Sequence, residues 1–166
     1  MAIKDALLPE FDHEMGSTRR VLERVPPADL AWTPHEKSFT LGKLAWHVAT
    51  LPNWIHPTLD ASFFDLDSRT DDDRLKEPGS VEAVLKAFDE SAKKARDKIA
   101  EQTDSAFLSP WTLKQGGQEM FTMPKIGVVR SFVMNHIIHH RGQLTVYLRL
   151  RNVPLPALYG PSADEG

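Results

Sequence analysis

Four separate segments of this chain carry apolar residues at every third or fourth position, which is the spacing of one face of an α-helix. They cover about residues 5–24, 40–55, 80–99 and 125–150. Thr40 and Ser80 open the second and third segments, and their hydroxyl groups can cap the free backbone N–H groups of a first helical turn. Amphipathic helices of this kind bury their apolar faces against one another, so we predict an all-α fold, a four-helix bundle.

One short β-hairpin is expected among the connections between these helices. Two β-prone runs, 111–113 and 120–123, flank Gly116 and Gly117 just before the last helix, and a Gly-Gly pair favours a tight turn. Pro52 should kink or end the second helix, because proline lacks the backbone N–H that a helix uses.

Five aspartates follow the second helix in a segment that we interpret as a solvated acidic linker, since it lacks the spacing of a calcium-binding loop. They are Asp65, Asp67, Asp71, Asp72 and Asp73. The last residues, 152–166, contain several prolines and glycines and are expected to wrap over the surface.

The length of 166 residues fits a single domain that spans the whole chain, 1–166. The net charge is −3 and no basic stripe is present, which argues against a nucleic-acid partner. Neither a membrane span nor a signal peptide is evident, so a cytoplasmic location is expected. The chain has no cysteine, and any metal would therefore be held by nitrogen or oxygen atoms.

Three histidines on apolar helix faces form the candidate functional site. His136 and His140 are four residues apart and project from one face of the last helix, one turn apart. His47 lies on the apolar face of the second helix, where a histidine by itself is more often a core residue. Because buried imidazoles without partners are costly, the three together indicate a divalent metal site with open positions for water or substrate.

Neighbouring residues are given structural interpretations. His139 points about 100° away from His140 and is read as a surface or supporting residue. Ile137 stands where a metalloprotease helix carries its glutamate, which disfavours peptide hydrolysis. Arg141 and Gln143 are predicted to lean away from the metal pair, toward the surface or a dimer contact. The remaining histidines and three of the tryptophans are assigned to solvated, connector, core or pocket-wall positions. These are His13, His35, His56, Trp46, Trp54 and Trp111.

The chain also resembles the DinB-like superfamily of small metal-binding four-helix bundles. The resemblance is carried by LLPEFDHEM (7–15), LGKLAWHVA (41–49), NHIIHHRGQL (135–144) and VPLPALYGPSADE (153–165), in the expected order. It implies an up-down-down-up bundle that is often a homodimer, with a divalent metal held by His47, His136 and His140. Several relatives are thiol-dependent transferases or isomerases that use bacillithiol, mycothiol or glutathione. The mycothiol-dependent isomerase type carries an additional domain that is absent here, so its reaction is not transferred.

The leading hypothesis for function is a metal-dependent S-transferase that joins a low-molecular-weight thiol to a small-molecule substrate. Zinc or nickel is the expected ion, and iron also fits imidazole ligands. Two alternatives stay open: a metal-assisted hydrolase, for which no general base can be assigned, and a non-catalytic stress-response protein with a structural metal. The sequence leaves open whether the protein is an enzyme, and it assigns no catalytic residue beyond the three ligands.

Overall fold

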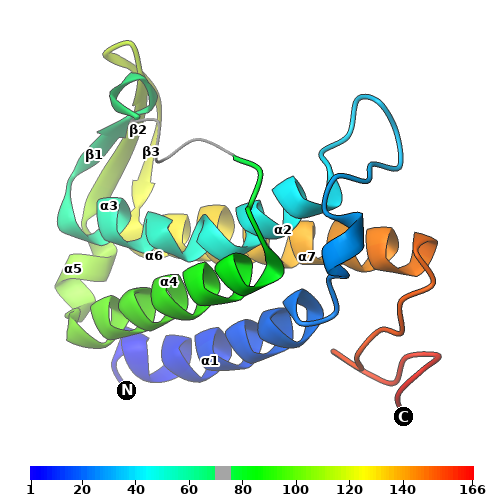
Figure 1. Cartoon of the computed structure of the whole chain (residues 1–166). Coiled ribbons are helices and arrows are strands. Elements are labelled where there is room, and N and C mark those ends of the chain that lie inside the picture. The colour runs from blue at the N-terminus through cyan, green and yellow to red at the C-terminus, as the bar shows by residue number, and fades with distance from the viewer. Residues whose placement is uncertain (70–75) are drawn as a thin grey trace.

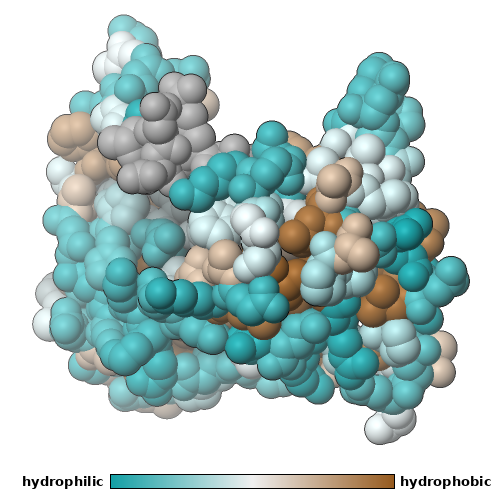
Figure 2. Space-filling view, in the orientation of Figure 1, coloured by the Kyte–Doolittle hydropathy of each residue, from teal (hydrophilic) through white to brown (hydrophobic). Residues whose placement is uncertain are grey.

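The computed structural model describes residues 1–69 and 76–166 (Figure 1). Its α-helices are α1 (Ile3–Leu22), α2 (Leu41–Thr50), α3 (Ile55–Asp60), α4 (Val81–Glu101), α5 (Asp104–Leu108), α6 (Lys125–Val128) and α7 (Asn135–Leu150). The long helices α1 and α4 contact each other. Helix α2 packs against α4, helix α7 packs against α1, and α2 and α7 contact each other. The core lies between these helices and includes Phe11, Leu44, Val48, Ile137 and Leu144, each almost fully buried. The outer surface over α1 and α4 is largely hydrophilic, as expected for amphipathic helices (Figure 2).

A three-stranded sheet stands at one end of the helices, so the fold is mostly helical rather than all-α (Figure 1). The predicted hairpin is present as β2 (Pro110–Gln115) and β3 (Gln118–Pro124) around Gly116 and Gly117, which have φ angles of 58° and 76°. The third strand, β1 (Phe63–Asp65), pairs in parallel with β2 and was not predicted. A parallel partner 49 residues away in the sequence leaves no local sequence signal. The described chain is therefore not confirmed as a simple four-helix bundle.

The first aspartate of the predicted acidic linker is bonded to the small sheet. The Asp65 carboxylate accepts hydrogen bonds from the backbone N–H groups of Asp67, Gly116 and Gly117, at 3.0, 3.1 and 2.7 Å. These bonds lower the pKa of Asp65 and tie β1 to the tip of the hairpin. Asp65 therefore belongs to a strand and not to a solvated linker, whereas Asp67 is exposed, as the interpretation of a solvated segment expects. The other aspartates of this segment, residues 71–73, lie outside the described residues.

The second helix begins and ends where the sequence predicts. The Thr40 hydroxyl accepts a hydrogen bond from the backbone N–H of Lys43 at 3.1 Å and also contacts the Glu77 carboxylate. At Pro52 the α-helix gives way to a 3₁₀ turn, Leu51–Trp54, before α3 continues the direction of the chain. This break keeps α2 at ten residues, and α2 packs against α7.

Replacing Thr40 with alanine should destabilise the protein by about 1 kcal/mol, because the first turn of α2 loses its cap. The Thr40→Ser variant retains the hydroxyl and serves as the control. The comparison is made by urea denaturation of both variants and the native chain. Equal midpoints for Thr40→Ala and the native protein would contradict this role.

The last helical segment runs from Lys125 to Leu150 as predicted, but it contains a π-helical turn at Val129–Met134. Such turns occur frequently at functional sites, because the extra residue changes which side chains face the core. Here the turn comes directly before the segment that carries His136 and His140.

The C-terminal residues wrap over the surface as expected. Asn152, with a φ of 59°, ends α7, and the tail is then fastened by ion pairs of Arg149 with Asp164 and of Arg24 with Glu165. Val153, Leu155 and Leu158 pack against the core. Among the described residues, no helix combines the length and apolar character needed to cross a membrane.

Candidate metal centre

Three imidazoles converge between α2 and α7. The Nε2 atom of His136 lies 3.4 Å from Nε2 of His47 and 2.8 Å from Nε2 of His140. All three side chains are partly buried, and their donor nitrogens lie within 4.8 Å of one another. The helical spacing of four brings His136 and His140 together, whereas the packing of α2 on α7 supplies His47.

The outer ring nitrogens are held by hydrogen bonds that set the direction of the inner ones. His140 Nδ1 lies 2.7 Å from Oε1 of Gln143, and the His136 ring is hydrogen-bonded to the backbone of Phe132 in the π-helical turn. The amide oxygen of Gln143 accepts from His140 Nδ1, which leaves the Nε2 atom of His140 facing the Nε2 atom of His136. The Nε2 atoms of all three imidazoles thus converge on one another.

Burial keeps these imidazoles neutral at physiological pH. Desolvation, together with smaller effects of the neighbouring His140 and His136, lowers the pKa of His47 to about 4. Desolvation also lowers the pKa of His136 and of His140, and the hydrogen bonds to Phe132 and Gln143 oppose it. Neutral imidazoles are the form that binds metal ions.

The donor set fits a divalent transition metal. Around a tetrahedral zinc ion with Zn–N bonds of about 2.0–2.1 Å, the ligand nitrogens are roughly 3.3–3.4 Å apart. The separation of His47 from His136 matches this value, and His136 and His140 would need to separate by only about 0.5 Å. Nitrogen ligands without thiolates suit zinc, nickel and iron, as expected for a chain without cysteine.

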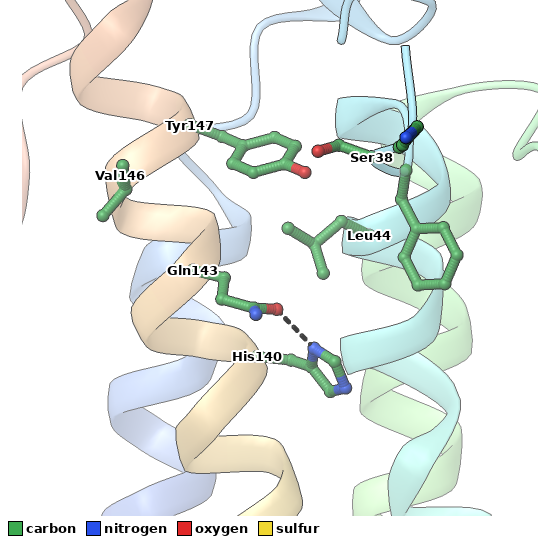
Figure 3. Close-up of a pocket in the computed structure, with 8 residues that line it drawn as sticks. Ser38, Leu44, His140, Gln143, Val146 and Tyr147 are labelled. Carbon is green, nitrogen blue, oxygen red and sulfur yellow. Dashed lines mark hydrogen bonds between the residues drawn. The ribbon is translucent and has the colours of Figure 1, made fainter. Parts of the chain in front are cut away.

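The prediction that Gln143 leans away from the metal pair is wrong. A helical offset of three residues places its amide over the His140 ring, where it orients that imidazole (Figure 3). Residues that support metal ligands in this way are a common part of metal sites. The i, i+3 spacing was the signal in the sequence that could have indicated it.

Arg141 points away from the metal pair as predicted, but it lies in the core and not at the surface or at a dimer contact. Its side chain is 2% exposed and forms an ion pair with Glu14 of α1 at 2.8 Å, and Glu14 is itself buried. The Tyr159 hydroxyl, from the C-terminal tail, lies within 2.9 Å of both Glu14 oxygens and 2.5 Å from Arg141. Arg141 is spaced by four, three and seven residues from buried positions of α7, which was the missed signal. Those positions are Ile137, Leu144 and Leu148.

The other singled-out histidines lie outside the cluster. His139 is exposed and packs only its ring edge against His140, with ring centroids 4.8 Å apart. His13 and His35 are exposed, and His56 contacts Asp60 at 3.3 Å. Trp111 is a core residue whose indole N–H donates to the Pro57 carbonyl. These positions agree with their structural interpretations.

A pocket of about 420 Å³ opens beside the cluster, between α7 and the loop that precedes α2 (Figure 3). His140 and Gln143 form part of its wall, so the pocket shares a side chain with the candidate metal centre. The remaining wall consists of Lys37, Ser38, Phe39, Leu44, Val146 and Tyr147.

The fold and the site together define a class of protein: mostly helical, with three convergent imidazoles between two helices and a pocket beside them. A family model described as the DinB family matches residues 1–166, and the chain belongs to that family. The resemblance found in the sequence is thereby confirmed.

Individual relatives agree with the family assignment. The chain is 24% identical over 161 residues to the uncharacterized protein YrdA of Bacillus subtilis strain 168, covering 97% of this chain and 90% of YrdA. A crystal structure of a DinB-like protein from Bacillus cereus ATCC 10987 has a TM-score of 0.74 at 23% identity, covering 95% and 98% of the two chains. A DinB-like protein of Bacillus subtilis, YjoA, has a TM-score of 0.68 at 15% identity, covering 91% and 96%. The solved structures show a shared fold.

Proposed function

We propose that His47, His136 and His140 hold one divalent metal ion and that the protein is a metal-dependent S-transferase for a low-molecular-weight thiol. The observation that carries the proposal is the convergence of three Nε2 atoms from α2 and α7, with the His140 ring oriented by Gln143. Neutral imidazoles that converge in this way can each offer a nitrogen lone pair to one cation between them.

A divalent ion held by three imidazoles would favour the thiolate form of a thiol at its open position. The residues of the chain orient the ligands and, through the apolar wall of the adjoining pocket, exclude water from the second substrate. In the overall reaction the thiol sulfur bonds to an electrophilic carbon, the leaving group departs with the bonding electron pair, and the thiol proton passes to solvent. Because the chain has no cysteine, no thiol of its own competes for the site.

The hydrolase alternative lacks a specific observation in its favour. Activating water for attack calls for a general base within hydrogen-bonding reach. None of the eight residues that line the pocket, all in the described part of the chain, is an aspartate or glutamate. A thiol releases its proton more readily than water does, so the thiol reaction depends less on such a base.

Metal content tests the first half of the proposal. Untagged protein purified without chelator should contain close to one divalent ion per chain by elemental analysis, and His136→Ala should contain almost none. His139→Ala, at the exposed neighbour, is the matched control and should retain the ion. Absence of metal from the native protein, or its retention in His136→Ala, would contradict the proposal.

Thiol binding tests the second half. Cobalt-substituted protein should change its visible absorption when glutathione or a bacillithiol- or mycothiol-type thiol is added, and it should accelerate reaction of one of them with a model electrophile. Ophthalmic acid, which resembles glutathione without the sulfur, should leave the spectrum unchanged. If no thiol changes the spectrum or supports turnover, the transferase proposal fails and a structural metal remains. The cytoplasmic location and the homodimer stay predictions.

A further inference from the structure

The pocket beside the histidine cluster has a lining that metal binding does not require. Phe39, Leu44, Val146 and Tyr147 provide an apolar wall, and its volume of about 420 Å³ suits a small organic molecule. Three of the lining residues precede α2, Leu44 lies on it, and the other four come from α7 (Figure 3). The pocket is thus built by the same two regions that bring the imidazoles together.

The formal charge of this lining is positive. Lys37 is the one formally charged side chain among the eight lining residues, since His140 is neutral. The ammonium group of Lys43 lies 5.6 Å from the centre of the Phe39 ring. In the described part of the chain, no carboxylate is recorded in an ion pair with Lys37. An apolar wall with a cation at its edge complements a molecule with an apolar body and an anionic end.

The loop that carries Lys37 is closed by its own hydrogen bonds. The Thr33 hydroxyl donates to the His35 carbonyl at 2.7 Å and also lies 3.3 Å from the carbonyl oxygen of Phe39. The backbone N–H of Lys37 donates to the His35 ring at 3.1 Å, and that of Ser38 donates to the His35 carbonyl at 2.9 Å. A wall organised before binding loses less conformational entropy when a ligand enters.

Two contacts join the pocket to the candidate metal centre. His140 belongs to both, and the Phe39 ring lies edge-on to the His47 ring with centroids 6.4 Å apart. A molecule against Phe39 therefore lies close to two of the three candidate metal ligands, His47 and His140. This placement is the one that a second substrate needs if it is to react with a bound thiol.

We propose that this pocket binds the second substrate of the transferase, a small molecule with an aromatic or alkyl body and a terminal anionic group that pairs with Lys37. That the bound molecule is a substrate rests on the proposed function, whereas its binding can be measured without turnover. The anionic end lies at Lys37, and the apolar body lies against Phe39, Val146 and Tyr147.

The test compares three probes that share a phenylpropyl body and differ in charge. They are 3-phenylpropane-1-sulfonate, 3-phenylpropan-1-ol and trimethyl(3-phenylpropyl)ammonium, of which the sulfonate and the ammonium compound are poor metal ligands. Dissociation constants are measured by NMR titration of full-length protein loaded with zinc, and metal content is determined on the same samples. The sulfonate should bind about two- to fivefold more tightly than the alcohol, since an exposed ion pair contributes modestly, and the ammonium compound most weakly.

Substitutions locate the binding. Lys37→Gln should remove the preference for the sulfonate, and Lys37→Glu should reverse it in favour of the ammonium compound. Lys94→Gln, at an exposed position of α4 outside the pocket, is the control and should change nothing. Val146→Ser, at an exposed wall residue, should raise the dissociation constants of all three probes by a similar factor without changing metal content.

The outcomes separate this inference from the metal proposal. If zinc is stoichiometric and no probe binds, or if Lys37→Gln leaves the charge preference intact, the pocket inference is overturned and the metal centre stands. If the sulfonate is preferred through Lys37 but the protein binds no metal, the pocket inference stands as a ligand site and the proposed function fails.

Discussion

Replacing Arg141 with methionine is expected to lower the free energy of unfolding by about 3–5 kcal/mol, the loss typical of breaking a buried ion pair from one side. The guanidinium group is buried against the Glu14 carboxylate, the Glu14 carbonyl and the Thr18 hydroxyl. Methionine fills much of the volume but leaves the carboxylate buried without a cation. Urea denaturation of the two proteins measures the difference.

Arg149→Met is the matched control, because Arg149 also lies on α7 and forms an ion pair, yet its side chain is 46% exposed. Arg149→Met should lower the free energy of unfolding by at most about 1 kcal/mol, as for other exposed ion pairs. The double variant Glu14→Leu with Arg141→Met should recover much of the loss, since both charges are then absent. A cost for Arg141→Met no larger than that of Arg149→Met would show that the buried pair contributes little.

The effect of His47→Leu on stability is expected to reverse sign with metal. Zinc at a hundred times its dissociation constant should raise the free energy of unfolding of the native protein by about 2.7 kcal/mol and that of the variant by almost nothing. In chelator the variant should be as stable as the native chain or more stable by up to about 1 kcal/mol, because leucine replaces a desolvated imidazole that has only a long contact with His136. Thermal and urea unfolding with and without zinc measure both effects.

His139→Leu is the control for this reversal, because it changes an exposed histidine next to the cluster. Its stability should respond to zinc as that of the native protein does. A native protein whose unfolding is indifferent to zinc and chelator would contradict the prediction. So would a large loss for His47→Leu in chelator, since it would show that the imidazole contributes to the fold without metal.

Local patterns in the sequence determined much of this protein. The spacing of apolar residues predicted the long helices, Thr40 and Ser80 were found at their caps, and Pro52 ends α2. These features depend on residues within one or two helical turns of each other, so a single stretch of sequence contains them. The same reasoning placed His136 and His140 on one face, and the order of four motifs indicated the DinB family that the family model shows.

Only the tertiary structure decided which distant residues meet. The partner of Arg141 is Glu14, 127 positions earlier, and β1 finds its parallel partner β2 across two helices. The wall of the pocket likewise joins the loop before α2 to side chains near the end of α7. Such contacts depend on how the helices pack. The physical reason is that burying a charge or a strand edge costs free energy, and only a partner brought to it by the packing compensates that cost. The sequence by itself thus determined the helices and the two neighbouring imidazoles, and the packing of those helices decided what surrounds them.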